Sequence, residues 1–156
     1  EIAQTKSRIK RLSLGGGDYT RDLGIEWTHD ELALLPIRSE IVLASRLGEL
    51  EPPIDTVFLH IKEHDAYRES CSRARGLGFQ GKLCIHPDQV DRTNDVFTPT
   101  EEVVTWSRKI VAEFEKAEKD GIASIQVDGY FVDYPIVVKA QRALNTIDLL
   151  KSLGKA

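Results

Sequence analysis

The sequence predicts an α/β protein in which about three parallel βα units precede an appendage of helix, β-hairpin and helix. Short β-type runs alternate with helical segments up to about residue 96, a Thr-Pro-Thr-Glu segment then opens a long amphipathic pattern, and an Asp-Gly pair separates two further β-type runs. We therefore expect two regions, residues 1–96 and 97–156. Three parallel strands cannot close a barrel, and a three-stranded parallel sheet is thin for an independent α/β domain. The chain is therefore expected to be the C-terminal part of something larger.

The first region is expected to contain three short strands, at residues 9–14, 56–60 and 82–85. The first run stops abruptly at a loop that contains three glycines and Asp18, and the third stops at Pro87. Helices are expected at residues 28–47, with a break at Pro36, and at residues 65–75, with Asp65 as a cap. A helix between two strands is the connection that a parallel sheet requires.

The second region carries stronger local signals. Thr98 is expected to cap a helix that has Pro99 at its first position and Glu101 completing a capping box. Residues 123–134 are expected to form a hairpin, because Asp128-Gly129 is a preferred pair for a tight type I′ turn. A last helix begins near Pro135. The apolar faces of the two helices are Val103, Trp106, Ile110, Phe114 and Ala117 in the first, and Ile136, Val137, Ala140, Ala143, Leu144 and Ile147 in the second.

Composition excludes several classes of protein. The chain has 156 residues with 41% hydrophobic and 29% charged side chains, which suffices for a buried core. Its net charge of −4 argues against a broadly basic nucleic-acid binder, and its apolar runs are too short for a membrane helix. No signal peptide is visible after Glu1, and two cysteines cannot form a disulfide framework, so we expect reduced thiols and a cytoplasmic location. A first residue other than Met indicates processing, truncation or a missing upstream stretch.

Three side chains could carry chemistry, and each has a simpler structural interpretation. Asp18 follows a strand and could offer a hard oxygen ligand to Mg²⁺, or it could stabilise its loop by an Asx turn. His86 also follows a strand and could be a ligand, a base or a hydrogen-bond donor, or a structural histidine. Asp133 precedes the last helix, where a carboxylate is favoured as an N-cap.

Other patterns are weaker. His60, His64 and Asp65 lie close together in the sequence, but no Cys or Glu at metal-binding spacing accompanies them. The sequence also contains no Walker loop, no G-x-G-x-x-G, no nucleophile elbow and no H-E-x-x-H.

Five segments together resemble the citrate lyase beta subunit family. The match covers about residues 11–144, and the third and last of the five segments are the most specific, because their order and spacing both agree. The segments are Leu-Gly-Gly-Gly-Asp-Tyr with Asp-Leu-Gly (14–19 and 22–24), Ile-Asp-Thr-Val-Phe (54–58), Gly-Phe-Gln-Gly-Lys with Ile-His-Pro-Asp-Gln (78–82 and 85–89), Phe-Thr-Pro-Thr-Glu (97–101) and Asp-Gly-Tyr-Phe-Val-Asp-Tyr-Pro (128–135).

The resemblance implies the C-terminal part of a TIM (β/α)₈ barrel with a C-terminal lid, in the wider 2-oxoacid aldolase superfamily. It also implies a Mg²⁺-dependent carbon–carbon lyase that cleaves a 3-hydroxy-3-carboxylic acyl-CoA thioester, of the citryl-, citramalyl- or malyl-CoA type, into a 2-oxoacid and acetyl-CoA. Asp18 matches a metal-ligating carboxylate, and Ile85, His86 and Pro87 match a segment typical of stand-alone CoA-ester lyases. Asp133 matches a lid aspartate that acts in trans on a neighbouring subunit of a homo-oligomer, expected to be a trimer.

The chain also departs from the family pattern. Gly17 stands where the family has an acidic residue, and His60 stands where an Asp is common. The amino-terminal barrel strands, with the other metal-ligating Glu and the enolate-stabilising Arg, are not in this sequence. Two hypotheses follow: the chain is the C-terminal part of a CoA-thioester lyase, or it is a non-catalytic barrel fragment that folds and binds only with a complementary amino-terminal half.

Overall fold

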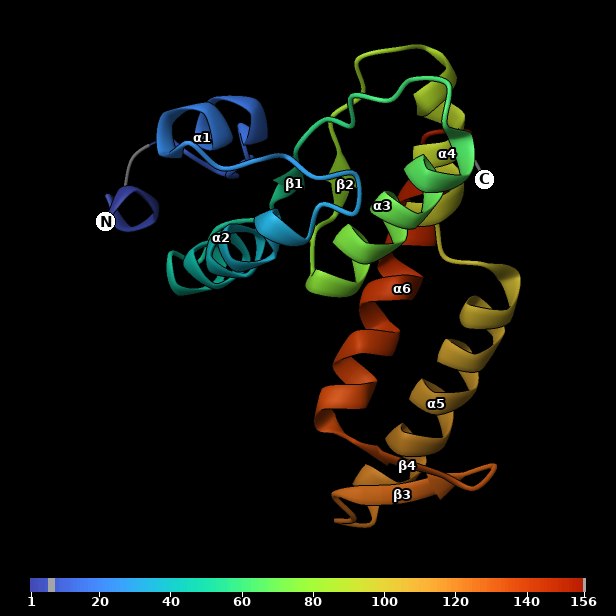
Figure 1. The fold of residues 1–156 in the computed structure, drawn as a ribbon. Coiled ribbons are helices and arrows are strands. Elements are labelled where there is room, and N and C mark those ends of the chain that lie inside the picture. Colours follow the sequence, from blue (N-terminus) through green and yellow to red (C-terminus); the bar gives the residue numbers. More distant parts are fainter. Residues whose placement is uncertain (6–7, 156) are drawn as a thin grey trace. The chain divides into compact units, whose positions relative to one another are not determined.

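The computed structural model describes residues 1–5 and 8–155 and divides the chain into two compact units, Glu1–Phe97 and Thr98–Ala156 (Figure 1). Within the described residues, no helix is both long enough and apolar enough to cross a membrane. Both cysteines are free, with Cys71 buried and Cys84 exposed.

The first unit is an α/β arrangement with more helix than strand. Its elements in order are η1 (Ile2–Gln4), α1 (Gly16–Leu23), η2 (Leu32–Leu34), α2 (Leu35–Leu47), β1 (Ile54–Asp55), α3 (His64–Leu77), β2 (Gly81–Lys82) and α4 (Asp88–Phe97). Its apolar core centres on Phe58, Tyr67 and Cys71, against which Ala66, Val96 and Phe97 pack.

Three segments of this unit pair in parallel, as the sequence predicts. Ile54 pairs with Gly81 and Asp55 with Lys82, and Ser13 forms a parallel bridge to Ile54. The paired stretches are shorter than expected, and one lies elsewhere. Ser13 is within the expected strand 9–14 and Lys82 begins the expected strand 82–85, but β1 precedes the expected strand 56–60, whose residues form no strand. Pro52 and Pro53 have no N–H to donate, so regular pairing begins only at Ile54. Beyond Asp55 the chain leaves the ladder.

Several helices of this unit differ from expectation. The glycine loop at residues 15–18 is the start of α1: the N–H of Tyr19 donates to the carbonyl of Gly15 at 3.0 Å and closes the first helical turn. Pro36 does not break a helix but lies in the first turn of α2, where its missing N–H costs nothing. Glu63, not Asp65, precedes α3 at the N-cap. The short helix α4 was not expected, because its sequence has few apolar residues.

The second unit consists of α5 (Glu101–Lys119), β3 (Ser124–Val127), β4 (Tyr130–Asp133) and α6 (Tyr134–Ser152). Helices α5 and α6 lie side by side, with the antiparallel hairpin at one end (Figure 1). Val127 pairs with Tyr130 across Asp128 and Gly129, which both have positive φ angles of 49° and 81°. These angles are those of a type I′ turn, so the predicted hairpin is confirmed.

Two details of the second unit correct the sequence analysis. The N-cap of α5 is Thr100, whose hydroxyl accepts from the N–H of Val103 at 3.3 Å, and not Thr98. This places Glu101 and Glu102 in the first turn, where the helix dipole favours acidic side chains. Val103 is 44% exposed and Val104 is buried instead. The core is Ile110, Phe114, Val127, Val132 and Ala140.

Candidate functional site

The parallel segments of the first unit end at one edge, called here the carboxyl edge and comprising residues 14–18, 56–63 and 83–89. At this edge the N–H of Gly16 donates to Oγ1 of Thr56 at 3.0 Å. A Cβ atom on Gly16 would lie 2.7 Å from that oxygen, so the approach requires glycine. The contact fixes the start of α1 against the end of β1.

Asp18 lies in the first turn of α1, at the carboxyl edge, rather than in a loop. Its side chain is 85% exposed and forms an ion pair with Arg21 at 3.3 Å. Among the described residues it makes no side-chain hydrogen bond to the backbone, so the Asx-turn interpretation is wrong. An exposed pair of this kind contributes little stability, which leaves the carboxylate available to a ligand.

His86 follows β2 at the same edge, and its side chain is 40% exposed. Nδ1 of its ring accepts from the N–H of Asp88 at 3.2 Å. An acceptor nitrogen carries no proton, so in the neutral ring the proton lies on Nε2, which can donate to a ligand. Ile85 is 49% exposed and Pro87 is also exposed, so the whole Ile85-His86-Pro87 segment is accessible.

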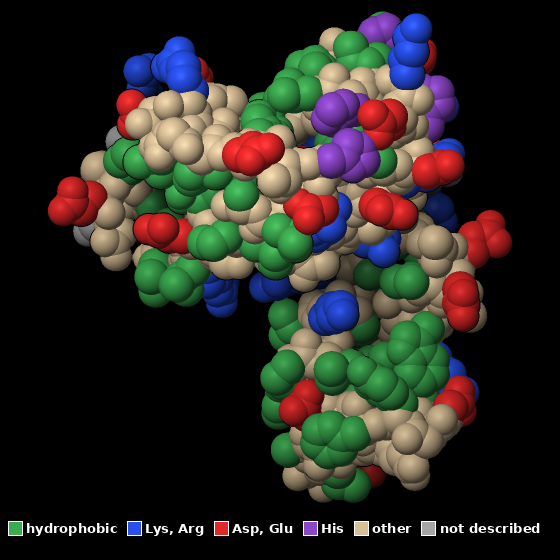
Figure 2. All heavy atoms as spheres, viewed as in Figure 1, with side chains coloured by type: hydrophobic (Ala, Val, Ile, Leu, Met, Phe, Trp, Pro, Cys, Tyr) green, Lys and Arg blue, Asp and Glu red, His purple; other side chains and the backbone are tan. Residues whose placement is uncertain are grey.

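A cluster of histidines around Glu63 was not anticipated. The Glu63 carboxylate forms ion pairs with Nε2 of His29 and, at 3.4 Å, with Nδ1 of His60. The rings of His29 and His60 have centroids 4.9 Å apart, and Figure 2 shows histidine side chains gathered over this part of the unit. His64 instead accepts from Arg92 at 2.9 Å. No local sequence pattern predicts the contact of His29 with Glu63, because the two are 34 residues apart in the sequence.

These groups do not form a metal centre. Within residues 1–5 and 8–155, no group of three or more His, Cys, Asp or Glu side chains is arranged to hold a metal ion. The grouping of His60, His64 and Asp65 that the sequence suggested is therefore absent from the described part, and His60 and His64 have the separate partners just given.

The His29 hydrogen bond lowers the pKa of Glu63 below its ordinary value, with smaller contributions from the charges of His29 and His60. A carboxyl whose pKa is lowered on folding stabilises the fold above its unfolded pKa and loses that contribution as the pH falls through the folded pKa. We expect His29→Ala to raise the Glu63 pKa toward the ordinary value, measured by NMR titration of the Glu63 carboxyl carbon. His86→Ala is the control, and an unchanged titration in His29→Ala would contradict the assignment.

A buried charge cluster lies beneath the carboxyl edge. Arg38 of α2 donates through Nε and Nη2 to the two oxygens of Asp55, both at 2.9 Å, and through Nη2 to Glu31 at 3.0 Å. Lys82 donates to Asp55 at 2.6 Å. The side chains of Arg38, Asp55 and Lys82 are fully buried, and that of Glu31 is 1% exposed. Two cations and two carboxylates balance one another and join α2, β1 and β2.

Electrostatics within this cluster favour the charged form of Arg38. Burial by itself would lower the pKa of Arg38, but the hydrogen bond and charge of Asp55, followed by those of Glu31, raise it above its ordinary value. Glu31 has a φ angle of 55°, a left-handed conformation that is uncommon outside glycine. Its bonds to Arg38 and Ser70 hold that conformation and attach the segment that carries His29 to the interior.

Asp133 belongs to the second unit. It is the N-cap of α6, and its side chain accepts from the N–H of Ile136 at 3.4 Å. The capping interpretation is thus observed, although the bond is long for a hydrogen bond. Beside it, Tyr130 and Phe131 of the hairpin are 53% and 62% exposed.

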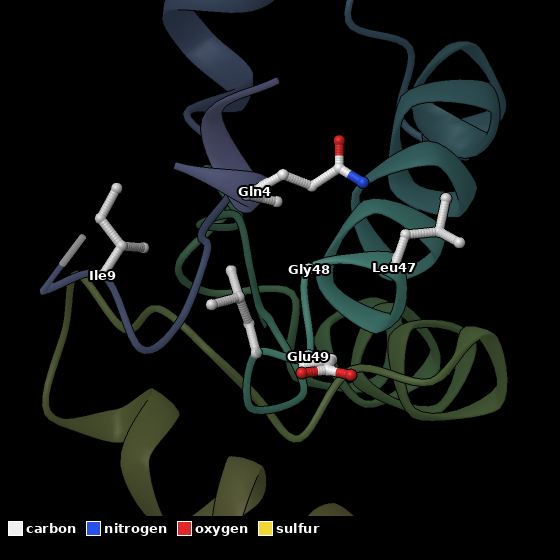
Figure 3. Close-up of a pocket in the computed structure, with 7 residues that line it drawn as sticks. Gln4, Ile9, Leu47, Gly48 and Glu49 are labelled. Atoms are coloured by element: carbon white, nitrogen blue, oxygen red, sulfur yellow. The ribbon is translucent and has the colours of Figure 1, made fainter. Parts of the chain in front are cut away.

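A cavity of about 420 Å³ in the first unit lies away from these residues. It is lined by Ala3, Gln4 and Ile9 from the amino-terminal segment and by residues 47–50 at the end of α2 (Figure 3). Ile9 and Leu50 precede the paired segments, so the cavity is at the amino edge. It includes none of the candidate site residues.

Parallel α/β proteins bind ligands where the carboxyl ends of their strands meet, and the first unit places an accessible carboxylate and an imidazole donor there. A protein-family model, HpcH/HpaI aldolase/citrate lyase, matches residues 1–87. The chain therefore belongs to the HpcH/HpaI aldolase/citrate lyase family.

Individual relatives agree with this assignment. The chain is 32% identical over 144 residues to citrate lyase subunit beta of Leuconostoc mesenteroides subsp. cremoris, covering 92% of this chain and 47% of the relative. It is 28% identical over 137 residues to a mitochondrial citramalyl-CoA lyase of Rattus norvegicus, covering 88% and 40%. The chain thus spans about half the length of the curated relatives that it matches, or less.

Solved structures show the same fold. The CitE protein of Mycobacterium tuberculosis, in complex with magnesium, acetoacetate and coenzyme A, superimposes with a TM-score of 0.77 at 25% identity, covering 94% of this chain and 54% of that one. A citrate lyase of Burkholderia xenovorans gives a TM-score of 0.73 at 18% identity and covers 99% and 49%, which is evidence for the fold alone.

Proposed function

We propose that this chain is the C-terminal part of a Mg²⁺-dependent carbon–carbon lyase whose complete TIM barrel cleaves a 3-hydroxy-3-carboxylic acyl-CoA thioester into a 2-oxoacid and acetyl-CoA. The observation that carries the proposal is the carboxyl edge: Gly16 and Thr56 hold Asp18 and its helix at the end of β1, and His86 follows the adjacent strand. The family membership and the CitE complex with magnesium and coenzyme A support the same chemistry.

Asp18 fits a magnesium ion as one ligand among several. Mg²⁺ usually takes one or two protein carboxylates and completes its shell with water and substrate oxygens. Asp18 offers an exposed carboxylate whose ion pair with Arg21 is weak, and the remaining ligands would come from the substrate and from an amino-terminal half of the barrel. When bound, the ion would supply Lewis-acid stabilisation of negative charge on oxygen.

The other residues would bind and enclose the substrate. Nε2–H of His86 would donate to an oxygen of the thioester or of coenzyme A, with Ile85 and Pro87 flanking it. A base removes the proton of the 3-hydroxyl group, the carbon–carbon bond breaks with its electron pair going to the acetyl thioester as an enolate, and the enolate then takes up a proton to give acetyl-CoA. Asp133 would act in trans as a catalytic carboxylate, from the lid of a neighbouring subunit in a homotrimer, and move a proton at the thioester while the lid excludes water.

The alternative is a non-catalytic fragment that folds and binds only with a complementary amino-terminal half. Leu83 and Ile85, at the carboxyl edge, are 42% and 49% exposed, which fits a surface that an amino-terminal half would cover under either hypothesis. The intact mass of the protein isolated from its source separates the two hypotheses. A mass of 17.5 kDa would support the fragment, and a mass about twice that would support the enzyme.

The reaction itself is tested on the longer species by assaying release of a 2-oxoacid from citryl-, citramalyl- and malyl-CoA with and without Mg²⁺. We expect Mg²⁺-dependent cleavage of at least one thioester. Failure to cleave all three in the presence of Mg²⁺ would overturn the proposed activity.

Asp18→Asn is expected to weaken Mg²⁺ activation about tenfold or more, because loss even of residues that only support metal ligands costs 10–100-fold. The measurement is the Mg²⁺ concentration that gives half-maximal lyase activity, with circular dichroism as a check on the fold. Asp22→Asn, an exposed position on the same helix, is the matched control. Equal Mg²⁺ dependence in the Asp18 and Asp22 variants would rule out Asp18 as a ligand.

A further inference from the structure

The side chain of Gln89 joins two separate loops of the carboxyl edge. Gln89 lies in the first turn of α4 and is only 2% exposed. Its Nε2 donates to the carbonyl of Phe58 at 3.1 Å, and its Oε1 accepts from the N–H of Ile85 at 2.9 Å. Both partners are backbone groups, one in the segment after β1 and the other in the segment after β2.

These two bonds connect the segments after β1 and β2 where their direct pairing has ended. The last direct rung between the segments runs from the N–H of Leu83 to the carbonyl of Asp55, at 3.0 Å. Two residues later, the N–H of Ile85 donates to the Gln89 amide, which in turn donates to Phe58. A regular parallel ladder would next join the N–H of Val57 to the carbonyl of Leu83, and then the N–H of Ile85 to the carbonyl of Val57. Here Ile85 donates to Gln89 and Gln89 donates to Phe58, so the amide is inserted between the two segments just beyond their last direct rung.

The same turn fixes His86. The N–H of Gln89 donates to the carbonyl of His86 at 3.0 Å, and the N–H of Asp88 donates to Nδ1 of the ring. The position of the imidazole relative to the β1 loop therefore depends on the inserted amide. A buried amide that lost either partner would carry the full cost of an unmade hydrogen bond, so the arrangement has little freedom.

We propose that Gln89 is a positioning residue, which separates the segments after β1 and β2 and sets where Nε2 of His86 is presented to the thioester. The part that concerns the thioester rests on the proposed function, whereas the separation of the segments does not.

The structural part is tested by amide hydrogen exchange on the 156-residue chain. In Gln89→Leu, which removes both bonds, we expect the protection of the Ile85 amide to fall at least tenfold. In Gln89→Glu at neutral pH, the ionised carboxylate can accept from Ile85 but cannot donate to Phe58. Protection of Ile85 should then stay within about threefold, while the amides of Ile61 and Glu63 in the β1 loop lose protection. Gln141→Leu, at an exposed glutamine of α6, is the control.

The functional part is tested by kinetics on the longer, active species. Gln89→Leu and Gln89→Glu should raise KM for the thioester about tenfold and change kcat less than threefold. Because Gln89 acts through His86, the effect on KM should disappear in a His86→Ala background. A tenfold effect that persists there, or an unchanged Ile85 protection in Gln89→Leu, would overturn the proposal. If no species cleaves a thioester, the proposed function fails, and the exchange result still decides whether Gln89 separates the segments.

Discussion

Replacing Asp55 with asparagine is expected to lower the free energy of unfolding of the first unit by about 3–5 kcal/mol, the usual cost of removing one partner from a buried ion pair. The substitution would leave the charges of Arg38 and Lys82 in a dry interior with only Glu31 to balance them. Nη1 of Arg38 is already buried without a hydrogen-bond partner among the described residues, so the guanidinium has no alternative acceptor at hand.

Urea denaturation followed by a probe in the first unit, such as Trp27 fluorescence, measures this effect. Asp65→Asn removes a carboxylate whose side chain is 99% exposed, and it should change stability by less than about 0.5 kcal/mol. Adding Lys82→Met to Asp55→Asn should recover part of the loss, because one unpaired cation is then gone. A single Asp55→Asn variant as stable as the Asp65→Asn control would show that the cluster is not a stabilising element.

Asp133→Ala is expected to reduce turnover by roughly 10²–10⁴, the range for loss of a group that acts directly in proton transfer, while stability falls by about 1 kcal/mol or less. Capping alone predicts the reverse pattern, with a lower Tm and turnover nearly kept. Asp133→Asn separates the two roles, because asparagine caps a helix about as well as aspartate but carries no charge. We expect Asp133→Asn to keep the Tm and lose turnover.

The action of Asp133 in trans is tested by mixing two inactive variants. Oligomers assembled from Asp133→Ala and Asp18→Asn subunits should regain activity, since some sites then combine an intact Asp18 with an intact Asp133 from a neighbour. Mixed oligomers that stay as inactive as their parents would show that Asp133 does not serve the site of another subunit.

Local signals in the sequence were sufficient for much of the architecture. Asp128-Gly129 specified the type I′ hairpin, Gly48 ended α2, and the 3.6-residue spacing placed Ile110 and Phe114 in the core of the second unit. Each of these depends on a few adjacent residues, so no knowledge of distant contacts was needed. The family motifs likewise led to the correct family.

Tertiary contacts decided the rest. Lys82 and Asp55 belong to recognisable motifs, but only the fold shows that they are buried together with Arg38, which lies 17 residues from Asp55 in the sequence. The glycines before Asp18 indicated a loop, and the bond of Gly16 to Thr56 made them the start of a helix.

The ends of the strands were decided in the same way. The β-type residues after Asp55 and Lys82 favour extended pairing, and sequence pattern alone extends both strands to the loops. The Gln89 amide bridges the two segments beyond their last rung, because a buried side chain that can both donate and accept satisfies two backbone groups at once. The sequence by itself thus determined the parallel order of the first unit and the family to which the chain belongs. The tertiary structure decided where pairing stops and which side chains meet, since those depend on hydrogen bonds between residues far apart in the chain.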